Sequence, residues 1–126
     1  MPAIILAMLS EALLDHFRNP RNAGELPGAT ARIEVSNPVC GDVLRLAAVF
    51  EDGVVREVGF LCRGCTASIA CASLLTESMR GRELRGLRKI TAESLSEALG
   101  GLPEASFHAA QLARLALEAL LEAVGK

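Results

Sequence analysis

The stretch Phe60-Leu61-Cys62-Arg63-Gly64-Cys65-Thr66-Ala67-Ser68 decides how the rest of the chain folds. An apolar, strand-like run ends here, the chain turns at Gly64, and a helix is predicted to begin at Cys65. The first N–H groups of a helix lack partners and carry partial positive charge, so the thiolate form of a cysteine is favoured there. Because the thiolate attacks sulfur and binds metal, Cys65 is a candidate functional residue.

Two alternating apolar runs before this helix predict a β-hairpin. The alternating positions are Leu44, Leu46, Ala48 and Phe50 in the first strand, and Val54, Val58, Phe60 and Cys62 in the second. We expect residues 51–53 to form a three-residue loop in which Phe50 faces Val54, because a two-residue loop would set Glu57 beside the apolar face. In the expected register, Asp42 lies opposite Cys62.

Helical spacing of apolar residues predicts further helices around the hairpin. We expect helices at residues 4–17, 66–80 and 91–97 and from residue 103 almost to the end, with another strand at residues 32–36. The inward faces of the first and last helices are expected to hold Ile5, Met8, Leu9, Ala12, Leu13 and Phe17, and Phe107, Ala110, Leu112, Leu115, Ala116, Ala119, Leu120 and Val124. This order predicts an α+β fold, a small three-stranded antiparallel sheet covered by a layer of helices.

Length and composition exclude several classes of protein. The 126 residues suit a single domain, residues 1–126. With a formal charge of -2, no Trp or Tyr and four Phe, the chain offers few stacking platforms, so nucleic-acid binding is not expected. The apolar residues 2–9 are too short for a membrane span and lack a basic lead-in, so they predict a packed helix and a cytoplasmic protein. There, the four cysteines indicate metal or redox chemistry.

Four residues form a candidate metal site. Cys40, Asp42 and Cys65 supply two thiolates and a carboxylate at one corner of the predicted sheet. His108 is the fourth candidate, because the start of the last helix disfavours protonation and keeps the imidazole in its metal-binding form. Together they could close a tetrahedral zinc site or hold a small iron–sulfur cluster. Each residue also has a structural explanation, as a buried thiol, a turn aspartate or a hydrogen-bonded histidine, and the spacing matches no standard zinc motif.

The remaining cysteines and histidine have separate interpretations. Cys62 and Cys65 form a Cys-x-x-Cys pattern between strand and helix, as in thiol oxidoreductases, although an antiparallel hairpin replaces the usual βαβ unit. Cys71 is expected in the core, and His16 is expected to bind a backbone group. Small residues in the helix after Cys65 predict close packing on the sheet, namely Ala67, Ser68, Ala70, Cys71, Ala72 and Ser73. Five basic residues between Arg80 and Lys89 predict a solvated surface.

Three segments carry a resemblance to a known family. They are Asp15-His16-Phe17-Arg18-Asn19-Pro20-Arg21-Asn22-Ala23-Gly24, Asn37-Pro38-Val39-Cys40-Gly41-Asp42 and Gly64-Cys65-Thr66-Ala67-Ser68-Ile69-Ala70-Cys71-Ala72-Ser73. They resemble the signature segments of the NifU/IscU-type iron–sulfur cluster scaffold family, nearest to its IscU branch. The resemblance implies a carrier, not an enzyme, that receives sulfur from a cysteine desulfurase. Such a carrier assembles a transient [2Fe-2S] cluster, passes it to apo-proteins, and binds zinc when no cluster is present.

The resemblance also assigns roles to the candidate ligands. It implies that Cys40 and Cys65 are cluster cysteines, that Asp42 keeps the cluster labile, and that His108 is the family's histidine of the last helix. One departure is Ala109, which stands where the family has a third cysteine that is a cluster ligand and a sulfur acceptor. Cys62 is the better candidate to compensate for it.

A second departure concerns a partner. Residues 104–106 read Glu-Ala-Ser where IscU-type scaffolds carry the Pro-Val-Lys recognised by a specialised Hsp70 chaperone, so hand-off through that chaperone is doubtful. A zinc-binding paralogue that accepts sulfur from a desulfurase or regulates it would share the same family features. The sequence leaves this alternative open beside the scaffold and the thiol oxidoreductase.

Overall fold

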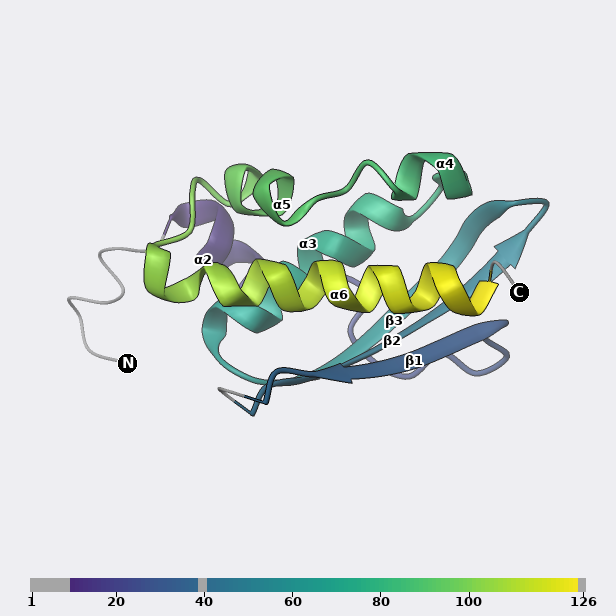
Figure 1. Cartoon of the computed structure of the whole chain (residues 1–126), viewed down its shortest axis with the longest axis horizontal. Helices are drawn as coiled ribbons and strands as arrows, with labels where there is room; N and C mark the ends of the chain where they lie inside the picture. Colours follow the sequence, from purple (N-terminus) through teal and green to yellow (C-terminus); the bar gives the residue numbers. More distant parts are fainter. Residues whose placement is uncertain (1–9, 39–40, 125–126) are drawn as a thin grey trace.

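The computed structural model describes residues 10–38 and 41–124. A three-stranded antiparallel sheet in the order β1-β2-β3 lies under a layer of helices (Figure 1). The elements are α2 (Glu11–Arg18), β1 (Ala31–Ser36), β2 (Val43–Glu51), β3 (Val54–Arg63), α3 (Thr66–Met79), α4 (Leu84–Leu87), α5 (Ala92–Ala98), η1 (Glu104–Ser106) and α6 (Phe107–Val124). This arrangement confirms the predicted fold class.

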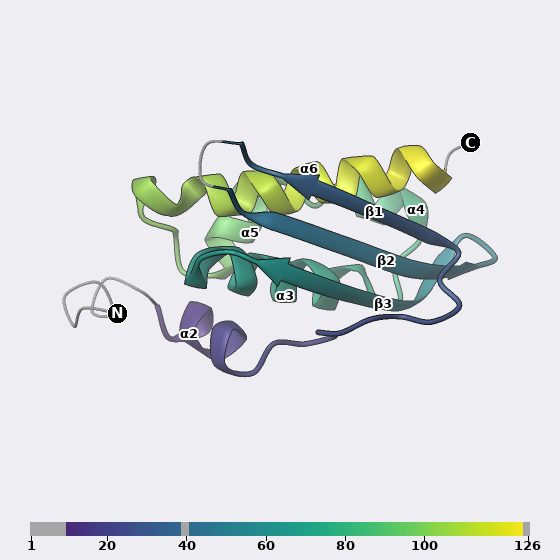
Figure 2. The ribbon, with the colours of Figure 1, turned by 90° about the horizontal axis from the view of Figure 1, so that it is seen from below.

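The helices cover one face of the sheet. Helix α3 packs on β3, α6 packs on β1 and β2, and α2 and α5 pack against these two helices. Seen from below, the sheet lies in front of the helices, and none of the described helices crosses its outer face (Figure 2). No helix among the described residues is long and apolar enough to span a bilayer.

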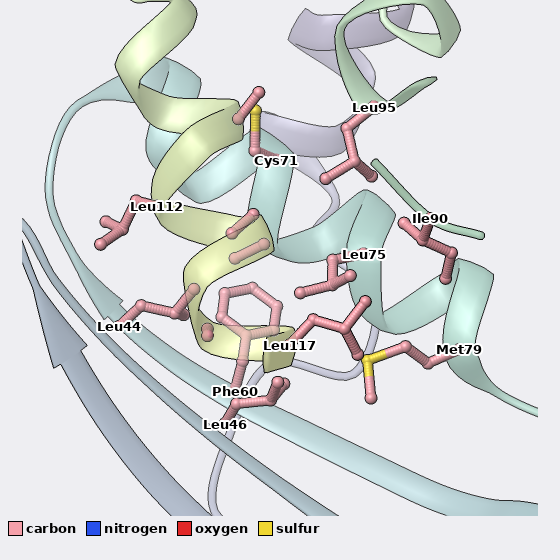
Figure 3. Packing of buried hydrophobic residues seen from close by; sticks show 14 of the residues in the cluster. Leu44, Leu46, Phe60, Cys71, Leu75, Met79, Ile90, Leu95, Leu112 and Leu117 are labelled. Carbon is pink, nitrogen blue, oxygen red and sulfur yellow. The ribbon is translucent and has the colours of Figure 1, made fainter. Parts of the chain in front are cut away.

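The core fills the space between the sheet and helices α3 and α6. Leu46 and Phe60 point up from the sheet toward Leu75, Met79 and Leu117 (Figure 3). Burial of this apolar surface is the main force that holds the two layers together. The start of β2, the end of β3 and the first turns of α3 and α6 lie at one end of this core, on the left in Figure 1.

The register of the β2–β3 hairpin differs from the predicted one. Leu44 pairs with Cys62, so the expectation that Asp42 lies opposite Cys62 is wrong by two residues. The turn has only two residues, Asp52 and Gly53, with φ of 54° and 76°. Positive φ at both central residues is the geometry of the tightest hairpin turn.

A β-bulge reconciles this short turn with the apolar pattern. Val49 pairs with Glu57 while Phe50 pairs with Val55, which leaves Arg56 as an extra residue in β3. The bulge shifts the alternation by one residue, so that Val55 is buried in place of the predicted Val54. Farther along the strand, Val58 and Phe60 still face the core, as predicted.

Helix α2 presents a different face from the predicted one. Ser10 caps it by accepting a hydrogen bond from the Leu13 amide, and residues 4–9 of the predicted helix lie outside the described residues. Leu13 and His16 are buried, whereas Ala12 and Phe17, both predicted to face inward, are exposed, Phe17 by 37%. His16 turns inward because its Nδ1 lies 2.8 Å from the Ser73 hydroxyl of α3, so its expected backbone partner is wrong. Burial, with Arg21 nearby, lowers the pKa of His16, which favours the neutral ring.

Helix α6 is buried on two sides because it lies between the sheet and α5. Leu117 and Leu121 are therefore buried, although they were absent from the predicted face. Leu115 is 46% exposed, so its predicted inward position is wrong. The basic residues between α3 and α5 are all exposed, as the prediction of a solvated surface requires; they are Arg80, Arg82, Arg85, Arg88 and Lys89.

Candidate metal centre

Three of the predicted ligands meet where the elements begin. Asp42 directly precedes β2, Cys65 is the N-cap residue of α3, and His108 is the second residue of α6. One ligand atom from each residue lies within 4.8 Å of the other two. The fourth predicted ligand, Cys40, lies outside the described residues.

Cys65 is exposed to solvent. Its backbone is extended, with φ −75° and ψ 171°, and its side chain makes no capping hydrogen bond to the helix. The side chain is exposed, whereas the helix it starts is buried against the sheet and α6. Cys65 thus offers a thiol beside the N–H groups of a helix start, as predicted.

Asp42 is held by a tight turn and a narrow pocket. Gly41 has φ 77°, and its amide donates to the Asn37 carbonyl at 2.7 Å, which bends the chain into β2. Asp42 is only 7% exposed. A Cβ on Gly64 would lie 2.8 Å from the Asp42 carboxyl carbon, so only glycine at position 64 leaves room for the carboxylate.

Ser68 contacts two of the candidate ligands. Its hydroxyl donates to Asp42 Oδ2 at 2.5 Å and lies 3.3 Å from Cys65 Sγ. Ser68 is 2% exposed and lies one helical turn after Cys65. Sequence reasoning treated Ser68 as a small packing residue and missed this role, although its i+3 spacing from Cys65 was a signal.

His108 is oriented by the backbone before it. Its Nδ1 lies 3.1 Å from the Ala105 carbonyl oxygen in η1. Because a carbonyl only accepts, Nδ1 donates in this hydrogen bond, and Nε2 is the ring nitrogen that remains to face a metal. Metal-binding histidines are commonly oriented by such a bond from the second nitrogen.

The donor atoms suit iron or zinc. Ligand atoms around a tetrahedral zinc ion lie about 3.5 Å apart, so the three described groups need only a small inward shift to share an ion. A thiolate and an imidazole favour borderline-soft metals, and a carboxylate adds a harder, more readily exchanged ligand. The geometry is therefore compatible with a zinc ion or with the iron of a small cluster.

Cys62 stands apart from this group. It pairs with Leu44 on the inner face of the sheet, is half-buried, and is absent from the cluster of ligand atoms among the described residues. Burial, with smaller contributions from Asp42 and Cys65, raises the pKa of Cys62 to about 11. A thiol that stays protonated is a poor nucleophile, which argues against a thiol oxidoreductase. Cys71 is fully buried in α3, as predicted.

The raised pKa predicts slow alkylation of Cys62. At pH 8 only about one thiol in a thousand would be ionised, and the labelling rate should rise roughly tenfold per pH unit. Peptide mapping after iodoacetamide treatment of the metal-free protein measures this rate. The same peptide from unfolded protein is the control, and rapid labelling of native Cys62 near pH 7 would contradict the prediction.

Comparisons with known proteins agree with the fold. The model of the family described as "NifU-like N terminal domain" matches residues 8–126. Iron-sulfur cluster assembly scaffold protein IscU 1 of Archaeoglobus fulgidus is 40% identical over 110 residues, which are 87% of this chain and 72% of that protein. The scaffold protein IscU of Azotobacter vinelandii is 38% identical over 114 residues, which are 87% of this chain and 88% of that protein.

Solved structures show the same fold. A putative iron-sulfur cluster assembly scaffold protein for the SUF system from Fervidobacterium islandicum AW-1 has a TM-score of 0.74 and 22% identity, over 91% of this chain and 97% of its own. The N-terminal part of a nitrogen-fixing NifU-like protein from Brucella abortus has a TM-score of 0.69 and 20% identity, over 97% and 95%. From the family model and the identity to the IscU proteins, we conclude that the chain belongs to the NifU-like N-terminal domain family.

Proposed function

We propose that this protein is an iron–sulfur cluster assembly scaffold that carries a transient [2Fe-2S] cluster as its cargo on Cys40, Asp42, Cys65 and His108. The observation that carries the proposal is the convergence of Asp42, Cys65 and His108, from three separate segments, within 4.8 Å. The names of the IscU relatives support it. As part of the same proposal, residues 1–126 act as one scaffold domain.

Each ligand has a chemical role in this proposal. Thiolates of Cys40 and Cys65 bind iron strongly, whereas the hard oxygen of Asp42 binds it less firmly and gives the cluster a point of release. His108 completes the set through Nε2, because Nδ1 is engaged with Ala105. In the absence of a cluster the same four groups hold zinc, for which two sulfurs, an oxygen and a nitrogen form a suitable tetrahedral set.

The partners follow from the cargo. A cysteine desulfurase supplies the sulfur, and apo iron–sulfur proteins accept the finished cluster. The exposed position of Cys65, at the start of α3, supports direct access by such partners. Residues Glu104–Ser106 form η1, which directly precedes α6 and its His108, and they lack the chaperone motif. In this proposal the protein acts as a carrier, not as an enzyme, and hand-off through that chaperone is not expected.

One observation favours a second candidate function. Ala109 is 1% exposed and cannot bind iron or accept sulfur, although it directly follows His108. A protein with this ligand set could retain zinc, dock on a cysteine desulfurase, and accept sulfur on Cys65 or regulate the enzyme without building a cluster. Cluster formation is what separates the two candidates.

Metal and sulfide analysis tests the proposal. Freshly purified protein should contain stoichiometric zinc. Anaerobic incubation with ferrous iron, cysteine, a cysteine desulfurase and excess dithiothreitol, which reduces the persulfide sulfur to sulfide, should replace the zinc with iron and acid-labile sulfide in equal amounts. Zinc that persists without sulfide would favour the second candidate. A protein that binds neither metal would reject both functions.

A further inference from the structure

We propose that Ser68 is a positioning residue of the metal centre, whose hydroxyl fixes the Asp42 carboxylate so that one oxygen, Oδ1, remains for the cargo. This inference rests on the proposed function and deepens it. It starts from a single side chain in α3 that touches two candidate ligands from different elements. A packing role alone needs neither contact.

The hydrogen-bond geometry gives the hydroxyl a specific partner. A serine hydroxyl has one proton, and here it donates to Asp42 Oδ2 at 2.5 Å. Hydrogen bonds to a carboxylate are short and about twice as strong as neutral ones. The contact to Cys65 Sγ is longer, at 3.3 Å, and sulfur is a weak hydrogen-bonding atom. Ser68 should therefore act mainly through Asp42.

Burial makes this single bond decisive for the orientation of Asp42. Asp42 is 7% exposed and Ser68 is 2% exposed, so water cannot easily replace the hydroxyl. The backbone of Gly64 closes the pocket, where an added Cβ would lie 2.9 Å from Oδ2. Ser68 holds Oδ2, and none of the described residues donates a hydrogen bond to Oδ1. Asp42 can therefore bind metal through Oδ1 alone.

Ser73 provides a matched comparison in the same helix. It is also fully buried, but its hydroxyl lies 2.8 Å from His16 Nδ1 and accepts a bond from the Arg21 amide, away from the candidate ligands. Loss of either hydroxyl removes a buried hydrogen bond from α3. Only the loss of Ser68 should change how the protein binds metal.

A double-mutant cycle with Zn²⁺ and Co²⁺ as probes tests the proposal. Ser68→Ala should weaken zinc affinity by about 10-fold to 100-fold, the usual cost of removing a hydrogen bond to a ligating group. In an Asp42→Ala background the same substitution should change the affinity by less than about twofold, because the carboxylate through which it acts is gone. The ligand-field spectrum of bound Co²⁺ should change in Ser68→Ala and remain unchanged in Ser73→Ala.

A second variant covers the case in which Ser68→Ala does not fold. The Cβ that Gly64→Ala adds would lie 2.9 Å from Asp42 Oδ2 and 3.1 Å from Ser68 Cβ, so this variant presses on the Asp42–Ser68 contact itself. It should also weaken zinc affinity and be non-additive with Asp42→Ala. Equal weakening in both backgrounds, or no weakening at all, would overturn the role of Ser68 while the wild-type protein still binds zinc. Failure of the wild-type protein to bind zinc would overturn the proposed function as well.

Discussion

Replacing Cys65 by serine should abolish cluster formation and lower zinc affinity by more than about 100-fold, beyond the range for residues that only support a ligand. The substitution removes a thiolate that lies within 4.8 Å of the ligand atoms of Asp42 and His108 and puts a hard hydroxyl in its place. Because the Cys65 side chain is exposed and makes no capping bond, the fold should be retained. Zinc titration and absorbance after anaerobic reconstitution measure both effects.

Cys62→Ser is the matched control for that experiment. It removes a thiol three residues earlier that faces the core and lies outside the group of ligand atoms. We expect it to leave zinc stoichiometry and cluster yield unchanged, with a modest loss of stability. Loss of cluster in Cys62→Ser would instead show that Cys62 compensates for the missing third cysteine, and equal effects of the two variants would contradict the assigned ligand set.

The sequence was sufficient to bring Asp42, Cys65 and His108 together, because each lies at the start of a recognisable element. A turn at Gly41, a helix start at Cys65 and the first turn of the last helix are strong local signals. Once the sheet and helices are in their layers, these starts meet at one end of the fold. The prediction therefore depended little on the detailed register.

The hairpin register could not be predicted in the same way, because the effects of a short turn and of a β-bulge on the apolar pattern cancel. The tight turn at Asp52 and Gly53 alone would turn the apolar positions of β3 outward, and the extra residue Arg56 restores them. Alternation of apolar residues constrains only the combined effect of turn length and bulge on which face each β3 residue takes. A longer loop without a bulge satisfied that pattern equally well, and only the structure distinguishes the two.

Partners of buried polar side chains were likewise hidden from the sequence. Ser68 and Ser73 occupy similar surroundings in the sequence of α3, yet one contacts Asp42 and the other contacts His16. Their partners are 26 and 57 residues away in the chain, so no local pattern specifies the pairing. The exposure of Phe17 has the same origin. The hydrogen bond between His16 and Ser73 places His16 on the buried face of α2, and the next residue, Phe17, then lies on the exposed side.

Ala109→Cys should convert the centre into one with a longer-lived cluster. If position 109 holds a ligand, as the family resemblance implies, the added thiolate replaces an oxygen or nitrogen at iron and binds it more strongly. Slower transfer to an apo-acceptor is expected, together with a reduction potential lower by on the order of 100 mV, because non-thiolate ligands raise the potential of such clusters. Timed transfer assays and potentiometry measure these changes.

Ala110→Cys is the control that separates ligation from the mere presence of a thiol. Both alanines are buried at the start of α6, but residue 110 projects about 100° farther around the helix. Ala110→Cys should therefore leave transfer rate and potential unchanged, while both variants tolerate one added sulfur at a cost of about 1–3 kcal/mol. If Ala109→Cys behaves like Ala110→Cys, the four predicted ligands already complete the centre, and the alanine at position 109 does not limit the lifetime of its cargo.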